Sequence, residues 1–454
     1  MRFKYLNQWL AWLETLHPKE IDLGLERIQQ VAEKLGVGSF DCQVVMIAGT
    51  NGKGSSVAAL EAIYGAEGYL VGSYSSPHMV HYCERIRIGG CPVSEATLME
   101  AFAAVDAARA DVSLSYFEFG TLAALYIFQR PQSINSCSLS NVTLPSLDIV
   151  FLEVGLGGRL DAVNIVNADL ALITTIDLDH QAWLGETREK IAREKVGIVR
   201  SGKPAVVGDL NVPQSVLDYT EKNTVPLSVQ GLDFGYFEEK GGATWHWWGR
   251  DALGEKCSVK NISEVKLLRD NLAAVLQVCH LLPLSLSRES MLSGLGVELP
   301  GRCERICGAV EYVLDVAHNA QAAEALARFL KAAPVKGKTY AIFGALSDKN
   351  ITTVISPLLN EVDEWFLAEL PVARSFSVKE LEGTVDKIAK ISHSLSKSKG
   401  AMCCEGVFRS PQAAYESAIL KANAGDRLLV FGSFYTVGAL REIILQSKIE
   451  IMCR

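Results

Sequence analysis

The chain lacks an excess of positive charge and also lacks any long hydrophobic run. Its 44 Lys and Arg residues stand against 52 Asp and Glu residues, which leaves a formal net charge of −8 over 454 residues. This charge provides no global attraction for nucleic acid or for an anionic membrane surface. No apolar stretch approaches the roughly 20 residues of a membrane span, and the N-terminus has no signal-peptide core. We therefore expect a cytoplasmic protein with no nucleic-acid or membrane partner, in which local positive charge binds any anionic substrate.

Cysteine is present, but not in the pattern of a disulfide or zinc framework. The 11 cysteines are odd in number and scattered along the chain. Such a set favours reduced thiols, as in a cytoplasmic protein. Cys403 and Cys404 are adjacent, and Cys303 and Cys307 have no second pair at the spacing of a zinc site. The sequence therefore predicts no structural zinc.

The length and the apolar content indicate an α/β fold with two domains. Apolar residues make up 49% of the chain, and 454 residues exceed what one hydrophobic core usually supports. Short apolar runs alternate with helical patterns in both halves, which is typical of parallel sheets covered by helices. The runs lie at 44–47, 71–74, 148–154, 170–176, 312–316, 339–343, 364–368 and 427–431. We expect domains at 1–298 and 299–454, the second being smaller and doubly wound.

Two segments interrupt this alternation. Pro131 to Pro145 is rich in Ser and Asn and is expected to be a surface loop. Gly231 to Gly254 contains several glycines and three tryptophans, Trp245, Trp247 and Trp248. This composition favours a β-hairpin in which the tryptophans pack.

A phosphate-binding turn follows the first apolar run and precedes a helical pattern at 57–63. Glycines allow the backbone to aim several N–H groups at an anion, the helix dipole adds positive charge, and Lys53 can reach the terminal phosphates. The glycine spacing is shorter than in the common loop, and Gly54 separates Lys53 from Ser55. The context nevertheless predicts a nucleoside triphosphate site. Its residues are Gly49, Thr50, Asn51, Gly52, Lys53, Gly54 and Ser55.

Polar residues follow three other apolar runs, where the carboxyl ends of parallel strands bind ligands. Ser76, Glu153 and His180 follow the runs at 71–74, 148–154 and 170–176. Taken singly, they fit a turn serine, a hydrogen-bonded carboxylate and a core histidine. Together, beside a phosphate loop, they predict a Mg²⁺ site with oxygen ligands and retained water. The next helical pattern contains Lys190 and Lys195, and the pattern alone does not choose between them.

Seven motifs occur in order along the chain. They are Gly-Thr-Asn-Gly-Lys-Gly-Ser at 49–55, Ser-Ser-Pro-His at 75–78, Glu-Val-Gly-Leu-Gly-Gly-Arg-Leu-Asp at 153–161, Asp-His-x-x-Trp-Leu-Gly at 179–185, Arg-Glu-Lys-x-Gly-Ile at 193–198, Leu-Pro-Gly-Arg at 299–302 and Asp-Val-Ala-His-Asn at 315–319. Jointly they resemble the folylpolyglutamate synthase family of ATP-dependent Mur-type ligases. Ile21 to Arg27 and Tyr116 to Thr121 resemble the subgroup in which one enzyme is both dihydrofolate synthase and folylpolyglutamate synthase.

The resemblance implies a fold and an activity. The fold would be a P-loop, Mur-ligase-like domain with a parallel sheet, followed by a smaller Rossmann-like domain. The activity would be ATP-dependent carboxylate–amine ligation, which adds L-glutamate to dihydropteroate and to reduced folates through an acyl phosphate. ATP is then a co-substrate, two Mg²⁺ ions are expected, and the protein is expected to be a monomer.

The resemblance also implies residue roles. The loop at 49–55 would bind ATP together with Asn271, Arg302 and Asp315, and Lys53, Lys195 and His318 would be catalytic. Ser76, Glu153 and His180 would ligate Mg²⁺, and a carbamylated Lys195 would ligate a second ion. The substrate-binding residues would be Ile21, Asp22, Leu23, Ser115, Tyr116, Phe117, Glu118, Leu160, Asp161 and Ala162. The chain departs from the family at Ala320, where proline is usual, and at Asp270 and Leu272, which flank Asn271.

Two other functions fit parts of the pattern. A Mur-type cell-wall ligase would use the same chemistry on a nucleotide-linked peptide, but the segment before Val44 is short for a uridine-binding domain. A P-loop ATPase or switch would hydrolyse nucleotide without a small acceptor.

Overall fold

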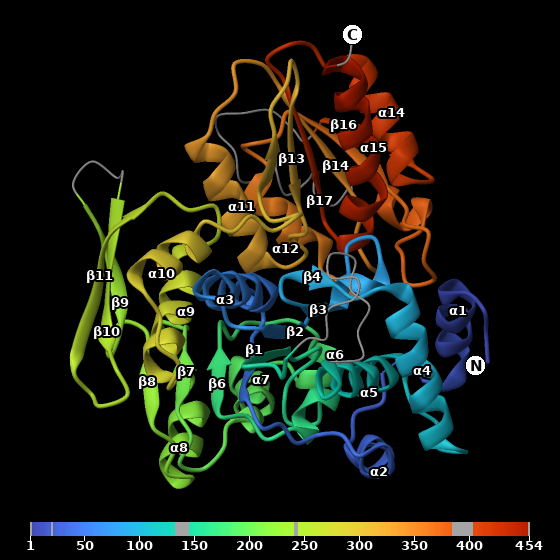
Figure 1. The fold of residues 1–454 in the computed structure, drawn as a ribbon. Helices are drawn as coiled ribbons and strands as arrows, with labels where there is room; N and C mark the ends of the chain where they lie inside the picture. Colours follow the sequence, from blue (N-terminus) through green and yellow to red (C-terminus); the bar gives the residue numbers. More distant parts are fainter. Residues whose placement is uncertain (1, 20, 132–144, 240–243, 384–402, 453–454) are drawn as a thin grey trace. The chain divides into compact units, whose positions relative to one another are not determined.

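The computed structural model describes residues 2–19, 21–131, 145–239, 244–383 and 403–452 (Figure 1). The chain divides into two compact units, Met1–Val297 and Glu298–Arg454. Within the described residues, no helix is long and apolar enough to cross a membrane. Most of the predicted loop between Pro131 and Pro145, at 132–144, lies outside the described part of the chain.

The first unit is built on an eight-stranded sheet with the order β4-β3-β2-β5-β1-β6-β7-β8. Its strands are β1 (Gln43–Ala48), β2 (Val71–Tyr74), β3 (Ile86–Ile88), β4 (Cys91–Pro92), β5 (Ile149–Glu153), β6 (Leu170–Ile173), β7 (Ala205–Val207) and β8 (Leu227–Val229). The six strands from β2 to β8 in this order pair in parallel, and β3 and β4 add antiparallel edges. The predicted strands near 44, 71 and 148 are confirmed, whereas the fourth ends three residues earlier than predicted, at Ile173.

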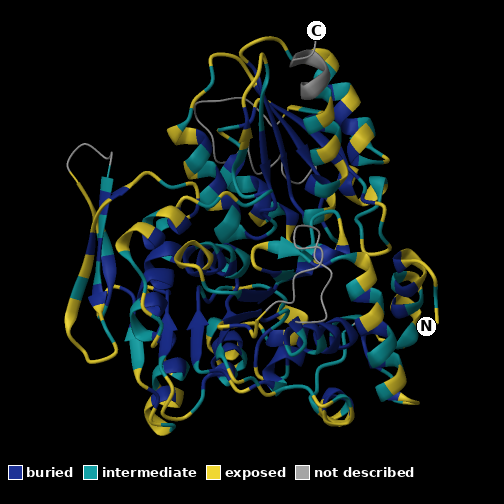
Figure 2. Cartoon of the chain, viewed as in Figure 1, coloured by how far each residue is buried: buried dark blue, intermediate teal, exposed yellow. Residues whose placement is uncertain are grey.

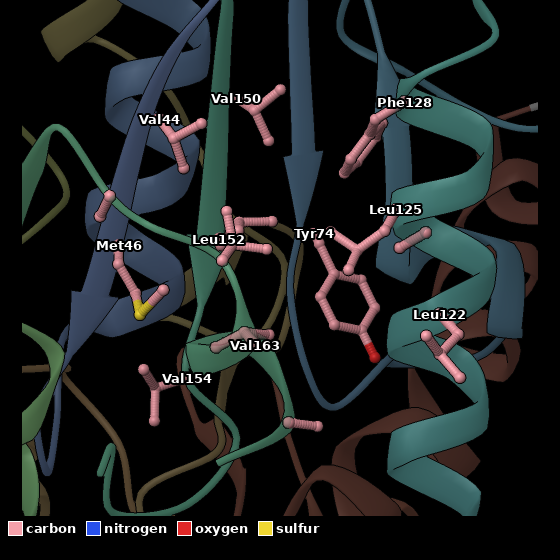
Figure 3. Close-up of a cluster of buried hydrophobic side chains, with 14 of the residues drawn as sticks. Val44, Met46, Tyr74, Leu122, Leu125, Phe128, Val150, Leu152, Val154 and Val163 are labelled. Atoms are coloured by element: carbon pink, nitrogen blue, oxygen red, sulfur yellow. The ribbon is translucent and has the colours of Figure 1, made fainter. Parts of the chain in front are cut away.

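Helices cover both faces of this sheet because successive strand residues point to opposite sides. On one face, Val150 and Leu152 of β5 share a buried cluster with Tyr74 of β2 and with Leu122 and Leu125 of α5 (Figure 3). On the other face, the ring of Phe151 lies 5.6 Å from that of Tyr64 in α3. The helices of this unit are α1 (Leu6–Leu16), α2 (Glu26–Leu35), α3 (Lys53–Glu67), α4 (Glu95–Arg109), α5 (Tyr116–Phe128), α6 (Gln181–Leu184), α7 (Arg188–Lys195), α8 (Gln214–Lys222), α9 (Arg269–Leu281) and α10 (Arg288–Leu295).

A separate antiparallel sheet contains the tryptophan-rich segment. Its strands are β9 (Gly235–Glu238), β10 (Thr244–Arg250) and β11 (Lys256–Ser263). Trp245 and Trp247 are fully buried, and the indole N–H of Trp247 donates to the carbonyl of Ala273 in α9 over 3.0 Å. The prediction that these tryptophans pack is confirmed for Trp245 and Trp247.

The second unit contains a six-stranded sheet with the order β12-β13-β17-β14-β15-β16. Its strands are β12 (Glu304–Ile306), β13 (Glu311–Asp315), β14 (Thr339–Phe343), β15 (Glu364–Ala368), β16 (Cys403–Phe408) and β17 (Arg427–Phe431). All pairs are parallel except β12 with β13. The accompanying helices are α11 (Ala320–Ala332), α12 (Ile351–Ile355), α14 (Pro411–Lys421) and α15 (Phe434–Met452). The central strands β5, β14, β15 and β17 are buried along their whole length (Figure 2), and the predicted α/β class is confirmed.

Candidate active site

The residues predicted to bind phosphate and metal follow four neighbouring parallel strands. In the order β2-β5-β1-β6, each strand pairs in parallel with the next. The carboxyl ends of these strands therefore meet at one edge of the sheet. Ser76 follows β2, Glu153 ends β5, the phosphate loop follows β1, and His180 lies beyond β6. The sheet order thus brings together segments that are separated by up to about 130 residues along the chain.

The phosphate loop is hydrogen-bonded to the segment that follows β6. The N–H groups of Thr50 and Asn51 donate to the carbonyl and hydroxyl oxygens of Thr175 over 2.7 and 3.1 Å. The hydroxyl of Thr174 donates to the carbonyl of Asn51 over 2.6 Å. A Cβ atom at Gly49 would collide with the Thr174 side chain. These bonds explain why β6 ends at Ile173: the next residues hold the loop instead of continuing the strand.

Lys53 and Asn271 lie directly at the loop. The ammonium group of Lys53 donates to the carbonyl oxygens of Gly49 and Thr50 over 3.0 and 3.4 Å. Gly52 adopts a left-handed φ of 88°, and a Cβ atom there would collide with the amide of Asn271 in α9. Helix α3 begins at Lys53, so its first N–H groups and its dipole are available to an anion. The structure therefore groups Asn271 with the predicted loop residues.

Two of the predicted magnesium ligands are in direct contact. The backbone N–H of Ser76 donates to Oε2 of Glu153 over 3.1 Å, and the Glu153 side chain is buried. The same carboxylate oxygen lies 3.6 Å from the position of a Cβ atom at Gly54. Glu153 thus lies between the Ser76 turn and the start of α3. His180 precedes α6 with a left-handed φ of 49°.

The donor chemistry of these residues fits a hard divalent cation. A buried carboxylate and a serine hydroxyl provide oxygen ligands, and Mg²⁺ commonly completes its shell with water and phosphate oxygen. In the part of the chain that the structure describes, no three His, Cys, Asp or Glu side chains form a metal site by themselves. A cation at Glu153 would therefore need the Ser76 hydroxyl, nucleotide or water as further ligands.

Lys195 is buried, whereas Lys190 is exposed. Lys195 is the last residue of α7. A glycine loop packs against the end of this helix: Arg159 donates its N–H to the carbonyl of Glu194 over 2.8 Å, and a Cβ atom at Gly158 would lie 2.9 Å from that same oxygen. Burial lowers the pKa of Lys195 to about 7, and the nearby charge of Lys53 adds to this effect.

Asp161 lies at the end of the glycine loop. Its carboxylate accepts the N–H groups of Leu156 and Val163 over 2.8 and 3.1 Å. Burial raises the pKa of Asp161 to about 7, although these hydrogen bonds and the charge of Lys53 oppose the rise. Leu160 is half-buried and Ala162 is buried beside it. The loop therefore presents a carboxyl group that can hold a proton near neutral pH.

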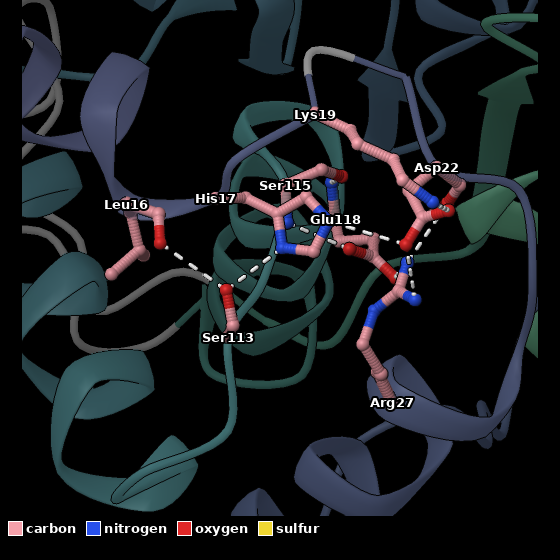
Figure 4. A network of polar contacts seen from close by, with 8 residues as sticks. All are labelled: Leu16, His17, Lys19, Asp22, Arg27, Ser113, Ser115 and Glu118. Carbon is pink, nitrogen blue, oxygen red and sulfur yellow. Dashed lines mark hydrogen bonds and ion pairs between the residues drawn. The ribbon is translucent and has the colours of Figure 1, made fainter.

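The predicted substrate residues Asp22, Ser115 and Glu118 belong to one polar network (Figure 4). Arg27 joins them: its guanidinium donates to the Asp22 carboxylate over 2.7 Å and to the Glu118 carboxylate over 3.1 Å. Glu118 in turn accepts the N–H of Ser115 over 2.7 Å, which caps α5. His17 also contacts Asp22, over 3.2 Å. The sequence analysis assigned no role to Arg27 or His17, although the motif from Ile21 to Arg27 includes Arg27.

Aromatic side chains connect this network to the glycine loop. Phe117 covers Gly155, where a Cβ atom would lie 2.6 Å from the ring. The same ring stacks on Tyr74 with centroids 5.9 Å apart. Tyr116 meets the ring of Tyr82 edge-on at 5.6 Å. Ile21 and Leu23 are half-buried in the segment of Asp22.

Three predicted residues gather at the carboxyl end of β13 in the second unit. Asp315 ends the strand and accepts the N–H groups of Cys303 and Ala317 over 2.7 and 2.8 Å. Its burial raises its pKa, although the charge of neighbouring Arg302 opposes the rise. His318 Nδ1 lies 2.9 Å from the carbonyl of Val316. Helix α11 begins at Ala320, so the missing proline leaves the helix start intact.

Comparison with known proteins bears on both units. The family model "Mur ligase, glutamate ligase domain" matches residues 301–434. The Escherichia coli K12 dihydrofolate synthase/folylpolyglutamate synthase is 40% identical over 441 residues, which cover 97% of this chain and 95% of the relative.

Two solved structures agree over nearly the whole chain. E. coli FolC in complex with DHPP and ADP is 38% identical with a TM-score of 0.86, covering 98% of this chain and 99% of that chain. A bifunctional folylpolyglutamate synthase/dihydrofolate synthase with Mn, AMPPNP and L-glutamate bound is 39% identical with a TM-score of 0.82, covering 97% and 98%. The chain therefore belongs to the dihydrofolate synthase/folylpolyglutamate synthase family.

Proposed function

We propose that this ATP-dependent ligase joins L-glutamate to dihydropteroate and also to reduced folates. The observation that carries the proposal is the contact between Ser76 and Glu153 at the start of α3, beside the loop that contains Lys53. This arrangement combines phosphate donors with an oxygen-rich cation site. The solved relatives support it, since one holds DHPP with ADP and another holds Mn, AMPPNP and L-glutamate.

ATP is assigned to the loop at 49–55 together with Asn271. Lys53 would exchange its bonds to the Gly49 and Thr50 carbonyls for bonds to phosphate oxygens, which carry more negative charge. In the second unit, Arg302, Asp315 and His318 supply a guanidinium, a carboxyl and an imidazole group for nucleotide. The proposal thus assigns ATP and folate to residues 1–298 and further nucleotide contacts to residues 299–454.

Ser76, Glu153 and His180 would hold Mg²⁺. When bound, this ion neutralises phosphate charge and orients the terminal phosphate. Lys195 would contribute to a second ion after carbamylation, which requires an unprotonated amine. The low pKa of Lys195, about 7, provides that form at neutral pH. Carbamylation would also replace a buried cation near Lys53 with a carboxylate-like group, which removes a repulsion between two positive charges.

The chemistry requires activation, because a carboxylate is a poor electrophile. The terminal phosphoryl group of ATP is transferred to the substrate carboxylate, ADP leaves, and an acyl phosphate forms. The glutamate amine then attacks the acyl carbon, phosphate leaves with its bonding electron pair, the nitrogen releases a proton to solvent, and an amide remains. The loop N–H groups and Lys53 position and stabilise the phosphoryl group. Asp22, Ser115, Tyr116, Phe117, Glu118 and Asp161, with Ile21, Leu23, Leu160 and Ala162, are assigned to the pterin substrate.

ADP release tests the proposal when dihydropteroate, tetrahydrofolate and glutamate are each supplied or omitted. We expect release only when glutamate and either pterin are both present. Release without acceptors would instead identify a P-loop ATPase, and inactivity with both pterins would favour a Mur-type cell-wall ligase. Activity with tetrahydrofolate alone would remove the dihydrofolate synthase half of the proposal. The monomeric state, the cytoplasmic location and the absence of a nucleic-acid partner stay predictions. Mass photometry can check the first of these, and fractionation can check the other two.

A further inference from the structure

Arg85 is a buried cation that has no carboxylate partner among the described residues. It ends the short 3₁₀ helix Tyr82–Arg85, and only 8% of its surface is exposed. Arg27 and Arg87, which are more exposed, each pair with a carboxylate, but Arg85 takes part in no ion pair within the described ranges. Burying an unpaired charge is costly, so proteins normally pair such a group with an anion.

Neutral groups surround the Arg85 guanidinium. Its Nε–H donates to Nδ1 of His78 over 2.9 Å. Its Cζ atom lies 4.9 Å from the ring centroid of Tyr82 and 5.6 Å from that of Tyr116. These aromatic faces attract the cation but do not neutralise it. The guanidinium therefore retains hydrogen-bonding capacity for an anion, because it has five N–H donors in total.

A second polar group in the same cluster lacks a partner. The hydroxyl of Tyr82 is buried and makes no hydrogen bond. It approaches Gly120 so closely that any side chain there would collide with it. A buried hydroxyl without a partner is rare and commonly marks a place where a ligand or water binds. Arg85 and Tyr82 thus offer two kinds of donor, which a single carboxylate with two oxygen atoms can accept.

The cluster adjoins both parts of the candidate active site. His78, which accepts the hydrogen bond from Arg85, is two residues beyond Ser76 in the chain. Tyr116, whose ring faces Arg85, opens α5 and precedes Phe117, whose ring covers Gly155 of the glycine loop. A ligand bound at Arg85 would therefore lie among residues assigned to the pterin substrate and near those assigned to the cation.

We propose that Arg85, assisted by the hydroxyl of Tyr82, binds a carboxylate group of the organic substrates during ligation. The inference rests on the proposed function, because that function supplies the carboxylates. Two sources share this chemistry: the benzoate carboxylate of dihydropteroate and the α-carboxylate of glutamate. The carboxylate would provide the counter-charge that the protein does not provide for Arg85.

Steady-state kinetics of Arg85→Met and Arg85→Lys test this assignment. We expect the KM for the carboxylate-bearing substrate that binds at Arg85 to rise about 10- to 100-fold in Arg85→Met, while the KM for ATP stays the same. A higher KM for dihydropteroate would identify its benzoate carboxylate as the group that binds at Arg85. A higher KM for glutamate would identify the α-carboxylate of glutamate instead. The matched control is Arg87→Lys, because Arg87 lies two residues away and already pairs with Glu61 over 3.0 Å.

Binding of modified ligands separates recognition from a structural role. Wild-type protein should bind dihydropteroate more tightly than its carboxamide, or glutamate more tightly than its α-amide, and Arg85→Met should lose that preference. Equal preference in wild type and variant overturns the inference. Failure of wild type to turn over these substrates would instead refute the proposed function, so the two failures are distinguishable.

The variant Tyr82→Phe tests the inference even if the Arg85 variants fail to fold. This change keeps the ring that faces Arg85 and removes a hydroxyl that makes no hydrogen bond, so the melting temperature should not fall. We expect a several-fold increase in the same KM. Unchanged KM values for both carboxylate substrates would overturn the inference.

Discussion

The backbone N–H of Ser76 donates a hydrogen bond to Oε2 of Glu153 over 3.1 Å. The bond links the carboxyl ends of two neighbouring strands, because Tyr74 of β2 is paired with Leu152 of β5. It orients the Glu153 carboxylate beside the first turn of α3. The sheet register therefore determines the geometry of the candidate cation site.

Glu153→Gln should separate metal binding from folding. The amide oxygen can still accept the Ser76 N–H, so the melting temperature should change by only a few degrees. Loss of the negative charge should lower the rate at least about 100-fold and increase the Mg²⁺ concentration that is needed. ADP release measured against Mg²⁺ concentration checks this, with Glu33→Gln on the exposed face of α2 as control. A normal Mg²⁺ requirement would contradict the assignment.

Gly52→Ala should abolish nucleotide binding through a collision with Asn271. Gly52 has φ 88° and no space for a Cβ atom, whereas Gly36 has φ 70° and nothing within 4 Å of that position. Both alanine variants should lose about 1–2 kcal/mol of stability from the left-handed backbone. Only Gly52→Ala should lose affinity for ADP, as measured by calorimetry. Equal ADP affinities would show that the loop tolerates the added methyl group.

Lys195 should make stability depend on pH in the alkaline range. Burial lowers its pKa from 10.5 to about 7 in the folded state, so the unfolded chain binds the proton more tightly. The contribution of Lys195 to the free energy of unfolding is most favourable above pH 10.5 and is lost as the pH falls to about 7. Relative to Lys195→Met, the wild type should lose up to about 1.4 kcal/mol per pH unit over this range.

Urea unfolding at several pH values, without bicarbonate, measures this dependence. The exposed Lys190 provides the control, since Lys190→Met should show the wild-type slope. Saturating bicarbonate should extend the slope below about pH 7 if a carbamate forms, because the modified nitrogen of the folded protein takes up no proton there while the unfolded amine does. A slope that still ends near pH 7 in bicarbonate would argue against carbamylation of Lys195.

Arg27→Met should weaken pterin binding more than ATP binding. The change removes the donors to Asp22 and Glu118, which join the Asp22 segment to the start of α5. We expect a loss of about 1–3 kcal/mol in unfolding free energy and a several-fold higher KM for dihydropteroate. The control is Arg2→Met, because the Arg2–Asp106 pair is exposed and such pairs contribute about 0–1 kcal/mol. Equal effects on both KM values would assign Arg27 a general structural role.

Much of the fold could be predicted because its strands and helices follow from local patterns in the sequence. Buried parallel strands need short, largely apolar runs, and the runs at 71–74, 339–343, 364–368 and 427–431 coincide with β2, β14, β15 and β17. The run at 170–176 was predicted too long. Thr174 and Thr175 are compatible with a strand, but their hydroxyl groups bind the phosphate loop, and only contacts with residue 51 reveal this.

The sequence by itself determined the family, the α/β class and the phosphate loop, because ordered motifs and local apolar patterns lie within single segments of the chain. Tertiary structure alone decided which of Lys190 and Lys195 is buried and that Arg27 joins Asp22 to Glu118. It also decided that Arg85 is buried with no carboxylate beside it in the described part of the chain. The physical reason is that burial and charge pairing depend on which distant segments pack together. The dielectric environment that those segments create cannot be predicted from a local sequence pattern.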